Sequence, residues 1–253
     1  QALEIYERMA DADGISSSCR VLAMDYAALG RFHDANAYAR RSVESGRKSK
    51  DEYRFGGSFI AQGDILLRIG DDAGALAAFS EAARIMDKLG KGEALGLVLS
   101  LIASIHWTRG DLPEALAVQR QAIAAAESDG RPGGADFARD RLAVFHLQTG
   151  DVAAAEEELA RSREGKIPDW GLLSLARKDY PKAARIYRKA IETHEKTRAD
   201  AQRLFGGYCG LGLSELGLKS YSRARDAFQK AVDLSEDERE ALAPEERAGF
   251  FSG

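Results

Sequence analysis

Two short stretches of the sequence resemble cofactor or catalytic motifs, and each lacks a residue that the chemistry requires. Gly210-Leu211-Gly212 begins like a dinucleotide-binding loop, but Glu215 stands where the third glycine should be, and no strand-like segment precedes it. The overlapping stretch from Gly212 to Leu216 lacks the closing glycine of a nucleophile elbow and lies in an expected helix. We therefore expect neither nucleotide binding nor serine-nucleophile chemistry here.

Histidine and cysteine offer few ligands for metal or redox chemistry. His194-Glu195 resembles the start of a zinc motif, but Arg198 occupies the place of the second histidine. Two cysteines cannot form a disulfide framework, which favours a reducing, cytoplasmic location. Cys209 lies near a glycine-rich helix start and could be reactive, but a buried, inert thiol is the favoured interpretation. We expect no metal, no cofactor and no catalytic residue, and therefore no enzyme.

The composition narrows the classes of partner. The 253 residues carry 36 basic and 40 acidic side chains, a formal charge of −4, which argues against general binding to nucleic acid or to an anionic membrane. The basic cluster Arg40-Arg41, Arg47-Lys48 and Lys50 has no interleaved aromatic residues, so we do not expect nucleic-acid binding there. No apolar run approaches the roughly 18–20 residues that a membrane-spanning helix needs.

The elements that would position any site follow a repeat. Four glycines lie 40 residues apart, and an alanine follows each of them five residues later. In these four units, and in two further units around Ala183 and Ala224, another small residue lies twelve positions before the reference alanine. The glycines are Gly30, Gly70, Gly110 and Gly150; the reference alanines are Ala35, Ala75, Ala115, Ala155, Ala183 and Ala224; the preceding small residues are Ala23, Gly63, Ala103, Ala143, Gly171 and Gly212.

This spacing predicts stacked helical hairpins and an all-α fold. A small residue at a fixed point on each helix lets a neighbour approach closely, and a larger residue four positions after the reference alanine fills the space between. Each spaced glycine can end a helix in the left-handed conformation, and the aspartate beside it can cap the next helix. No strand-like alternation competes. The larger residues are Phe79, Leu159, Tyr187 and Phe228, with Ala39 and Gln119 as weaker matches; the aspartates are Asp71, Asp111, Asp151 and Asp179.

These residues resemble the tetratricopeptide repeat over nearly the whole chain. The closest match to that family's second helix runs from Lys178-Asp179-Tyr180 through Ala183 to Ala190. The resemblance implies a right-handed α-solenoid of stacked antiparallel helical hairpins. A period of 40 residues rather than 34 is similar to the long-helix variety found in kinesin light chains and many bacterial signalling proteins.

We expect a single solenoid domain over residues 1–253. It divides into a half-unit at 1–14, six units at about 15–50, 51–90, 91–130, 131–165, 166–197 and 198–235, and a charged C-terminal helix and tail at 236–253. Only 28 residues separate Ala155 from Ala183, so we expect either a bend or a deletion that the stack absorbs. A half-unit at the start leaves a solenoid end without a polar cap, which predicts a piece of a longer protein.

The resemblance implies a concave groove lined by the first helix of each unit, at positions 15, 11, 8 and 7 residues before the reference alanine. An apolar stripe edged by polar residues lies at these positions and suits an extended or helical peptide or a neighbouring domain. We expect Trp107 to be the main contact, whereas the leucines of the stripe could equally pack between units. The expected partner-binding residues are Arg20, Asp64, Leu67, Arg68, Ser100, Ser104, Trp107, Thr108, Asp140, Val144, Leu147 and Gln148, with Leu172 and Leu175 following in the short unit.

Two histidines share one repeat position, 40 residues apart. His106 and His146 could line a pH-sensitive or ligand-binding seam. The favoured interpretation is that they replace the aromatic residue that the family prefers there, as Tyr26 does in its own unit.

The expected function is a non-catalytic protein–protein interaction scaffold that forms the regulatory or sensor segment of a larger signalling or effector protein. The resemblance implies arrays beside enzymatic domains, including caspase-like peptidases of the CHAT class, and the tail from Pro244 to Phe251 loosely resembles the junction before such a domain. The alternative is a small-ligand or peptide-pheromone sensor that closes around its ligand. The expected partner is a protein or peptide in the groove, with no nucleic acid and no membrane, and an effector domain is expected outside this chain.

Overall fold

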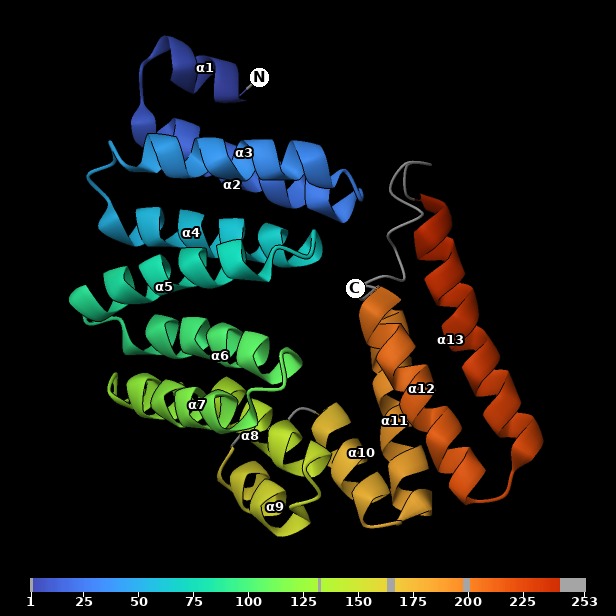
Figure 1. Ribbon diagram of the computed structural model, residues 1–253. Helices are drawn as coiled ribbons and strands as arrows, with labels where there is room; N and C mark the ends of the chain where they lie inside the picture. Colours follow the sequence, from blue (N-terminus) through green and yellow to red (C-terminus); the bar gives the residue numbers. More distant parts are fainter. Residues whose placement is uncertain (1, 132, 163–166, 198–200, 242–253) are drawn as a thin grey trace. The chain divides into compact units, whose positions relative to one another are not determined.

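The computed structural model describes residues 2–131, 133–162, 167–197 and 201–241, which form thirteen α-helices and no strand (Figure 1). The expected all-α fold is confirmed. The chain divides into a first unit that includes residues 1–134 and a second unit of residues 135–240. The first unit contains α1 (Ala2–Arg8), α2 (Ala12–Ala28), α3 (Phe32–Gly46), α4 (Glu52–Arg68), α5 (Asp72–Lys88), α6 (Gly92–Thr108) and α7 (Leu112–Glu127). The second contains α8 (Asp136–Gln148), α9 (Val152–Arg161), α10 (Ile167–Ala176), α11 (Tyr180–Lys196), α12 (Ala201–Gly217) and α13 (Tyr221–Ala241).

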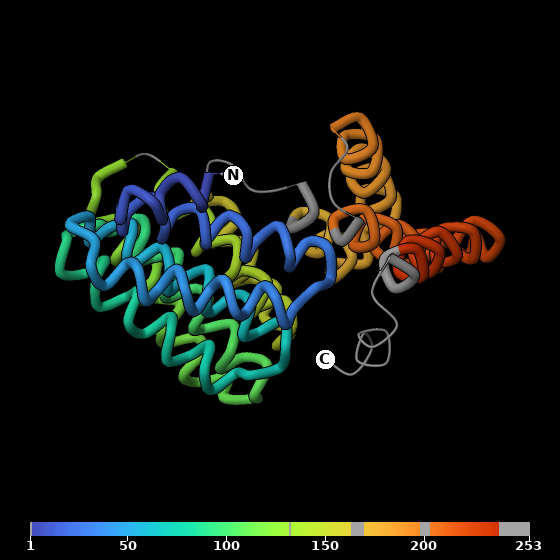
Figure 2. The backbone as a smooth tube through the Cα atoms, turned by 90° about the horizontal axis from the view of Figure 1, so that it is seen from above, coloured from blue at the N-terminus to red at the C-terminus, as the bar shows by residue number. Residues whose placement is uncertain are grey.

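Successive helices pack against each other as hairpins within each unit. In the first unit α2 packs on α3, α4 on α5 and α6 on α7, and α3 and α5 each contact the first helix of the next pair. The backbone trace shows α2 and α3 running side by side (Figure 2). In the second unit α8 packs on α9, and α11 packs on both α10 and α12. Each unit is therefore a stack of helical hairpins, as the repeat predicts.

The hairpin tips explain the 40-residue spacing of glycine. The four spaced glycines have φ angles of +73°, +78°, +84° and +83°, in the left-handed region that glycine adopts without a steric cost. At one tip the N–H of Asp71 donates to the Leu66 carbonyl at 2.8 Å, the hydrogen bond that closes a helix end of this kind. In the last two hairpins Lys178 and Lys219 occupy the same position, with φ of +60° and +59°. A side chain in this conformation costs on the order of 1 kcal/mol.

Three of the four predicted aspartate caps are present. Asp71, Asp151 and Asp179 each accept a hydrogen bond from the backbone N–H three residues later, at 2.9, 3.1 and 3.2 Å. The prediction for Asp111 is wrong, because its side chain accepts no such bond at the start of α7. Its carboxylate oxygen Oδ2 lies 3.8 Å from Nδ1 of His106 instead.

Helix α6 receives its cap from the end of α7, its partner in the same hairpin. No side chain of its own N-cap residue caps this helix. Instead the Asp129 carboxylate, which follows α7, accepts hydrogen bonds from the backbone N–H groups of Glu93 at 2.8 Å and Gly92 at 3.0 Å. These two bonds, with that of Glu93 the larger effect, hold the pKa of Asp129 below its usual range.

At the core of each hairpin, a small residue on the first helix is matched by a residue on the second whose size varies from hairpin to hairpin. Where the first helix carries glycine, the second carries an aromatic ring: a Cβ built on Gly63 would lie 2.5 Å from Phe79. The same holds for Gly171 against Tyr187 and for Gly212 against Phe228. The other three hairpins pair alanine with a non-aromatic residue, namely Ala23 with Ala39, Ala103 with Gln119 and Ala143 with Leu159. Close contact between the two helices is therefore kept because a smaller side chain on the first helix is compensated by a larger one on the second.

The short spacing between two reference alanines is taken up by short helices. Both α9 and α10 have ten residues, which accounts for the short interval between Ala155 and Ala183. Residues 163–166, between these two helices in the sequence, lie outside the described residues. Whether the stack bends there or absorbs a deletion stays a prediction.

Candidate functional site

The solvent-facing side of the first helices is the candidate partner surface, and the repeat offsets describe it only in part. Some residues eleven positions before the reference alanine are exposed: Met24 on α2 and Leu213 on α12 are 56% and 48% exposed, and Asp64 on α4 is also exposed. Residues seven positions before it, such as Arg68 and Thr108, are exposed as well. In each unit, the residues at these two offsets and at the offset of eight, which includes Trp107 and Leu216, are called the first-helix face below.

Two of the expected partner-binding residues are buried instead. Ser100 is fully buried, donates a hydrogen bond from Oγ to the Gly96 carbonyl at 2.9 Å, and accepts one from Gln119 Nε2 at 2.9 Å. Asp140, at the equivalent point of α8, is 5% exposed. The offset of fifteen residues marks a buried side chain at these two points, whereas Arg20, at the same offset on α2, is half-buried.

The first unit carries a mixed polar and apolar face. Asp64 and Arg68 lie one turn apart on α4 and are both exposed. Desolvation by the surrounding protein raises the pKa of the Asp64 carboxyl group above its ordinary value, and the positive charge of Arg68 partly opposes this shift. The remaining expected residues of this unit, which are Arg20, Leu67, Ser104 and Trp107, are half-buried.

Trp107 is half-buried, so it is accessible to solvent and also packs against the protein. It lies in the last turn of α6, and the neighbouring Ser104 hydroxyl donates to the Ser100 carbonyl at 2.8 Å. Thr108 donates to the Ile105 carbonyl at 3.0 Å, so both hydroxyls are engaged within α6. Trp107 is half-buried, so part of this residue is accessible to a partner.

In the second unit the stripe residues of α8 contribute mainly to the core. Leu147 is half-buried and packs against a cluster that includes Ala143 and Leu159, while Val144 is half-buried and Gln148 is exposed. For Leu147 the interpretation as a packing residue between hairpins is therefore supported.

The same offsets counted from the last reference alanine identify residues that the sequence analysis missed. Leu213 and Leu216 on α12 are 48% and 46% exposed, and Phe205 on the same helix is 41% exposed. Gly206 shares this side, and a Cβ built there would meet no atom within 4 Å. With Leu172 on α10, which is 38% exposed, these residues form an apolar face that no charged side chain interrupts at the offset positions. Leu213 and Leu216 lie eleven and eight residues before Ala224, so the repeat spacing alone could have identified them.

A buried carboxylate fixes the helices behind this face. Glu215 on α12 is 1% exposed and forms ion pairs with Arg188 on α11 and with Arg223 on α13, the second at 3.0 Å between Nε and Oε2. Both arginine side chains remain more than half exposed. The two arginines pair a carboxylate that water hardly reaches, and the ion pairs join α11, α12 and α13.

The candidate chemical residues do not assemble into a reactive group. The Nδ1 atoms of His106 and His146 lie 3.8 and 4.0 Å from the carboxylates of Asp111 and Asp151, in equivalent places of two hairpins. Desolvation raises the pKa of the Cys209 thiol, as expected for an inert thiol. Within the described ranges no group of three or more histidine, cysteine or acidic side chains could hold a metal ion. No helix in that same part of the chain is long and apolar enough to cross a membrane.

Comparison with known proteins agrees with the repeat. Tetratricopeptide repeat models match residues 20–88, 58–128 and 206–238, together more than half of the chain. No curated protein matches the sequence. The crystal structure of BtubC (BKLC) from P. vanneervenii is similar at TM-score 0.63 and 18% identity, over 81% of this chain and 91% of that one.

Two other solved structures are similar at TM-score 0.67 and 14% identity. Aspartyl phosphate phosphatase F from Bacillus subtilis aligns over 88% of this chain and 60% of its own. A Rap protein complexed with Competence and Sporulation Factor aligns over 89% of this chain and 66% of its own. At this level of identity the likeness concerns the fold. Repeat spacing, hairpin geometry and family models agree, and the chain belongs to the tetratricopeptide repeat family.

Proposed function

We propose that this chain is a non-catalytic scaffold that binds a protein or peptide on the first-helix face. The observation that carries the proposal is the exposure of large apolar side chains at one repeat-equivalent position, Met24 on α2 and Leu213 on α12. Within each unit, an exposed apolar side chain at this position offers a contact to a partner. The similar structures include a Rap protein in complex with a factor and a signal transduction ATPase with a tetratricopeptide repeat sensor, which is consistent with this use.

The two units differ in the partner chemistry that they favour. On α4 the exposed Asp64 and Arg68 can select a partner with polar groups at matching places. On α12 the exposed Leu213 and Leu216 have no charged neighbour at the offset positions and favour the apolar side of an amphipathic helix or extended segment. We propose peptide or domain recognition that uses polar selection in one unit and apolar contact in the other.

A finer proposal is that this scaffold forms the regulatory or sensor segment of a larger cytoplasmic effector protein, such as a CHAT-type peptidase. This part rests on the resemblance of the sequence. The segment from Pro244 to Phe251 that favours it lies outside the described residues.

The test is to select peptides from a displayed library on the intact chain and to measure their affinity for single variants. Leu213→Asp places a charge on the first-helix face and should weaken binding about tenfold or more, because a buried apolar contact is replaced by a charge that must be desolvated. Val232→Asp is the matched control, since Val232 on α13 is 51% exposed and lies outside the face. Circular dichroism should show both variants folded.

Two results would overturn the proposal. One is that no peptide is selected above background. The other is that Leu213→Asp and Val232→Asp weaken binding equally, which would show that the face is not the contact. Trp107→Ala extends the test to the first unit, where loss of binding with unchanged helicity and melting would place the indole in the contact.

A further inference from the structure

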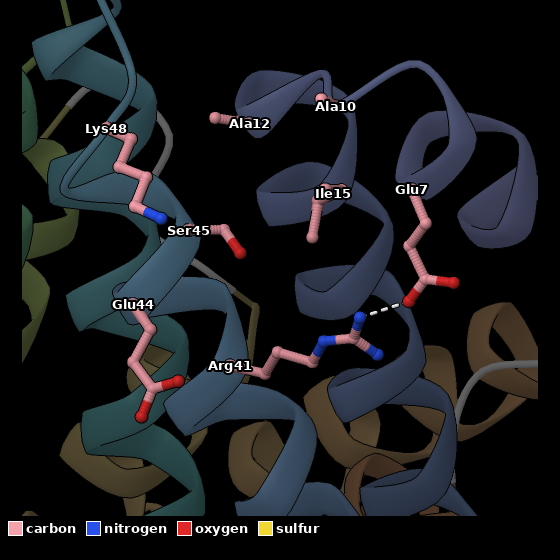
Figure 3. A pocket seen from close by; sticks show the side chains of 8 residues that line it. All are labelled: Glu7, Ala10, Ala12, Ile15, Arg41, Glu44, Ser45 and Lys48. Atoms are coloured by element: carbon pink, nitrogen blue, oxygen red, sulfur yellow. Dashed lines mark hydrogen bonds and ion pairs between the residues drawn. The ribbon is translucent and has the colours of Figure 1, made fainter.

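A cavity of about 410 Å³ lies in the first unit, away from the first-helix face (Figure 3). Side chains from α1, α2 and α3, and from the turn that follows α3, line it. Its volume falls in the range of pockets that hold small molecules. None of its lining residues belongs to the partner-binding surface described above.

The two sides of the cavity differ in chemistry. Ala12 and Ile15, on the first turn of α2, and Ala10 before it supply an apolar wall. The opposite wall comes from Arg41, Glu44 and Ser45 on α3 and from Lys48 in the turn after it (Figure 3).

Helix α1 closes the third side and is held in place by two contacts. The Arg41 guanidinium donates a hydrogen bond to the Glu7 carboxylate, which joins α3 to α1. The Tyr6 ring lies where a side chain at Gly14 would stand, so glycine allows α1 to pack directly on α2. These two contacts join α1 to α2 and α3, the helices that carry most of the other lining residues.

A carboxylate and an ammonium group remain available in the cavity. Glu44 and Lys48 lie four residues apart, the spacing at which a helix would pair them, yet no ion pair joins them or links either to another described residue. The reason is that α3 ends at Gly46, so Lys48 lies in the turn beyond the helix and leaves its register. The Ser45 side chain lies next to Glu44 on the same wall.

We propose that this cavity binds a small apolar zwitterion, a free amino acid or a dipeptide. Glu44 would hold the ligand's ammonium group, Lys48 and the Ser45 hydroxyl its carboxylate, and the wall at Ile15 its apolar side chain. The charges around the cavity support this class, because two acidic and two basic side chains balance and one pair, Arg41 with Glu7, is already satisfied. A ligand with a single charge would leave either Glu44 or Lys48 unpaired.

Isothermal titration of the full chain tests the proposal with four probes: leucine, leucyl-leucine, N-acetyl-leucine and leucinamide. We expect leucine or leucyl-leucine to bind, and the longer zwitterion to be preferred if the cavity takes a dipeptide. The two capped forms should bind about tenfold or more weakly, because each loses one charge-assisted contact. Absence of heat for all four probes at millimolar concentration would refute the proposal, as would equal binding of capped and uncapped forms.

Variants assign the two ends of the ligand. Lys48→Gln should weaken leucine and N-acetyl-leucine but leave leucinamide unchanged, and Glu44→Gln should weaken leucine and leucinamide but leave N-acetyl-leucine unchanged. Lys50→Gln is the matched control, since Lys50 is exposed and does not line the cavity. Both Glu44 and Lys48 are exposed, so the variants should fold as the parent does. If Lys50→Gln reduces binding as much as Lys48→Gln, the contact is nonspecific and the site assignment is wrong.

Discussion

The pairing of glycine with an aromatic ring inside a hairpin makes a quantitative prediction for Gly63 and Phe79. A Cβ built on Gly63 would lie 2.5 Å from Cε1 of Phe79 and 2.7 Å from Cδ1 and Cζ, and the ring is fully buried. Overpacking of this kind costs about 1–3 kcal/mol. The higher helix propensity of alanine offsets about 1 kcal/mol of this cost. Gly63→Ala should therefore destabilise the first unit by about 0–2 kcal/mol.

A second substitution should rescue the first. Phe79→Leu alone leaves a cavity and should cost roughly 1–2 kcal/mol. The double variant restores the combination that Ala143 and Leu159 use in another hairpin, because the added methyl group occupies the space that the ring leaves. The two effects should therefore not add, and the coupling energy should favour the double variant by about 1–3 kcal/mol.

A neighbouring glycine supplies the control. A Cβ built on Gly57, on the same helix α4, would meet no atom within 4 Å. Gly57→Ala should therefore stabilise the unit by about 0.5–1 kcal/mol through the lower flexibility of the unfolded chain.

The measurement is urea unfolding followed by the fluorescence of Trp107. A Trp170→Phe background in every variant removes the signal of the other unit, since the chain has two tryptophans. Additive effects of Gly63→Ala and Phe79→Leu would refute this compensation between the two positions. So would equal changes in stability for alanine at Gly57 and at Gly63.

Three further predictions concern charge and backbone conformation. Replacing both Arg188 and Arg223 by methionine should destabilise the second unit by about 3–5 kcal/mol in urea unfolding, because Glu215 stays buried without a partner. Glu215→Leu should destabilise it less, since both arginines can return to water. A larger loss of stability for Glu215→Leu would contradict this prediction. Lys178→Gly should raise the melting temperature by relieving a φ of +60°, worth about 1 kcal/mol, and a lower melting temperature would count against strain at that tip. Because the pKa of Asp129 is lowered in the folded chain, its contribution to stability is present above the pKa of Asp129 in the unfolded chain and is lost as pH falls through its pKa in the folded chain. Asp129→Asn should therefore make the melting temperature depend less on pH across that acidic range. An unchanged pH dependence would show that this cap is not the cause.

Much of the fold follows from local sequence. The left-handed tip at Gly70 favours glycine and the cap at Asp71 needs a short acceptor, so both are visible as residue types at fixed spacing. The small residue at Gly63 and the ring at Phe79 likewise mark a helix contact. These features depend on neighbours along the chain or within one hairpin, which is why spacing alone predicts stacked helical hairpins.

The candidate surface was predicted less well. The offsets located Met24 and Asp64 in the open, but they also included Ser100 and Asp140, which are buried. Whether a helix position meets solvent depends on the residues packed against it, and the Gln119 side chain that covers Ser100 belongs to another helix. The exposed Leu213 could have been found by continuing the same spacing to the last repeat.

The sequence by itself determined the hairpin, its period and the small-residue contacts, because these follow from helix geometry and from the conformational freedom of glycine. Only the tertiary structure decided that Lys178 takes the left-handed tip, that Glu215 is buried between two arginines, and that three helices enclose a cavity near Ile15. The burial of Glu215 and the cavity depend on side chains brought together from different helices. Their burial and distance are set by packing, which residue spacing along one chain does not specify.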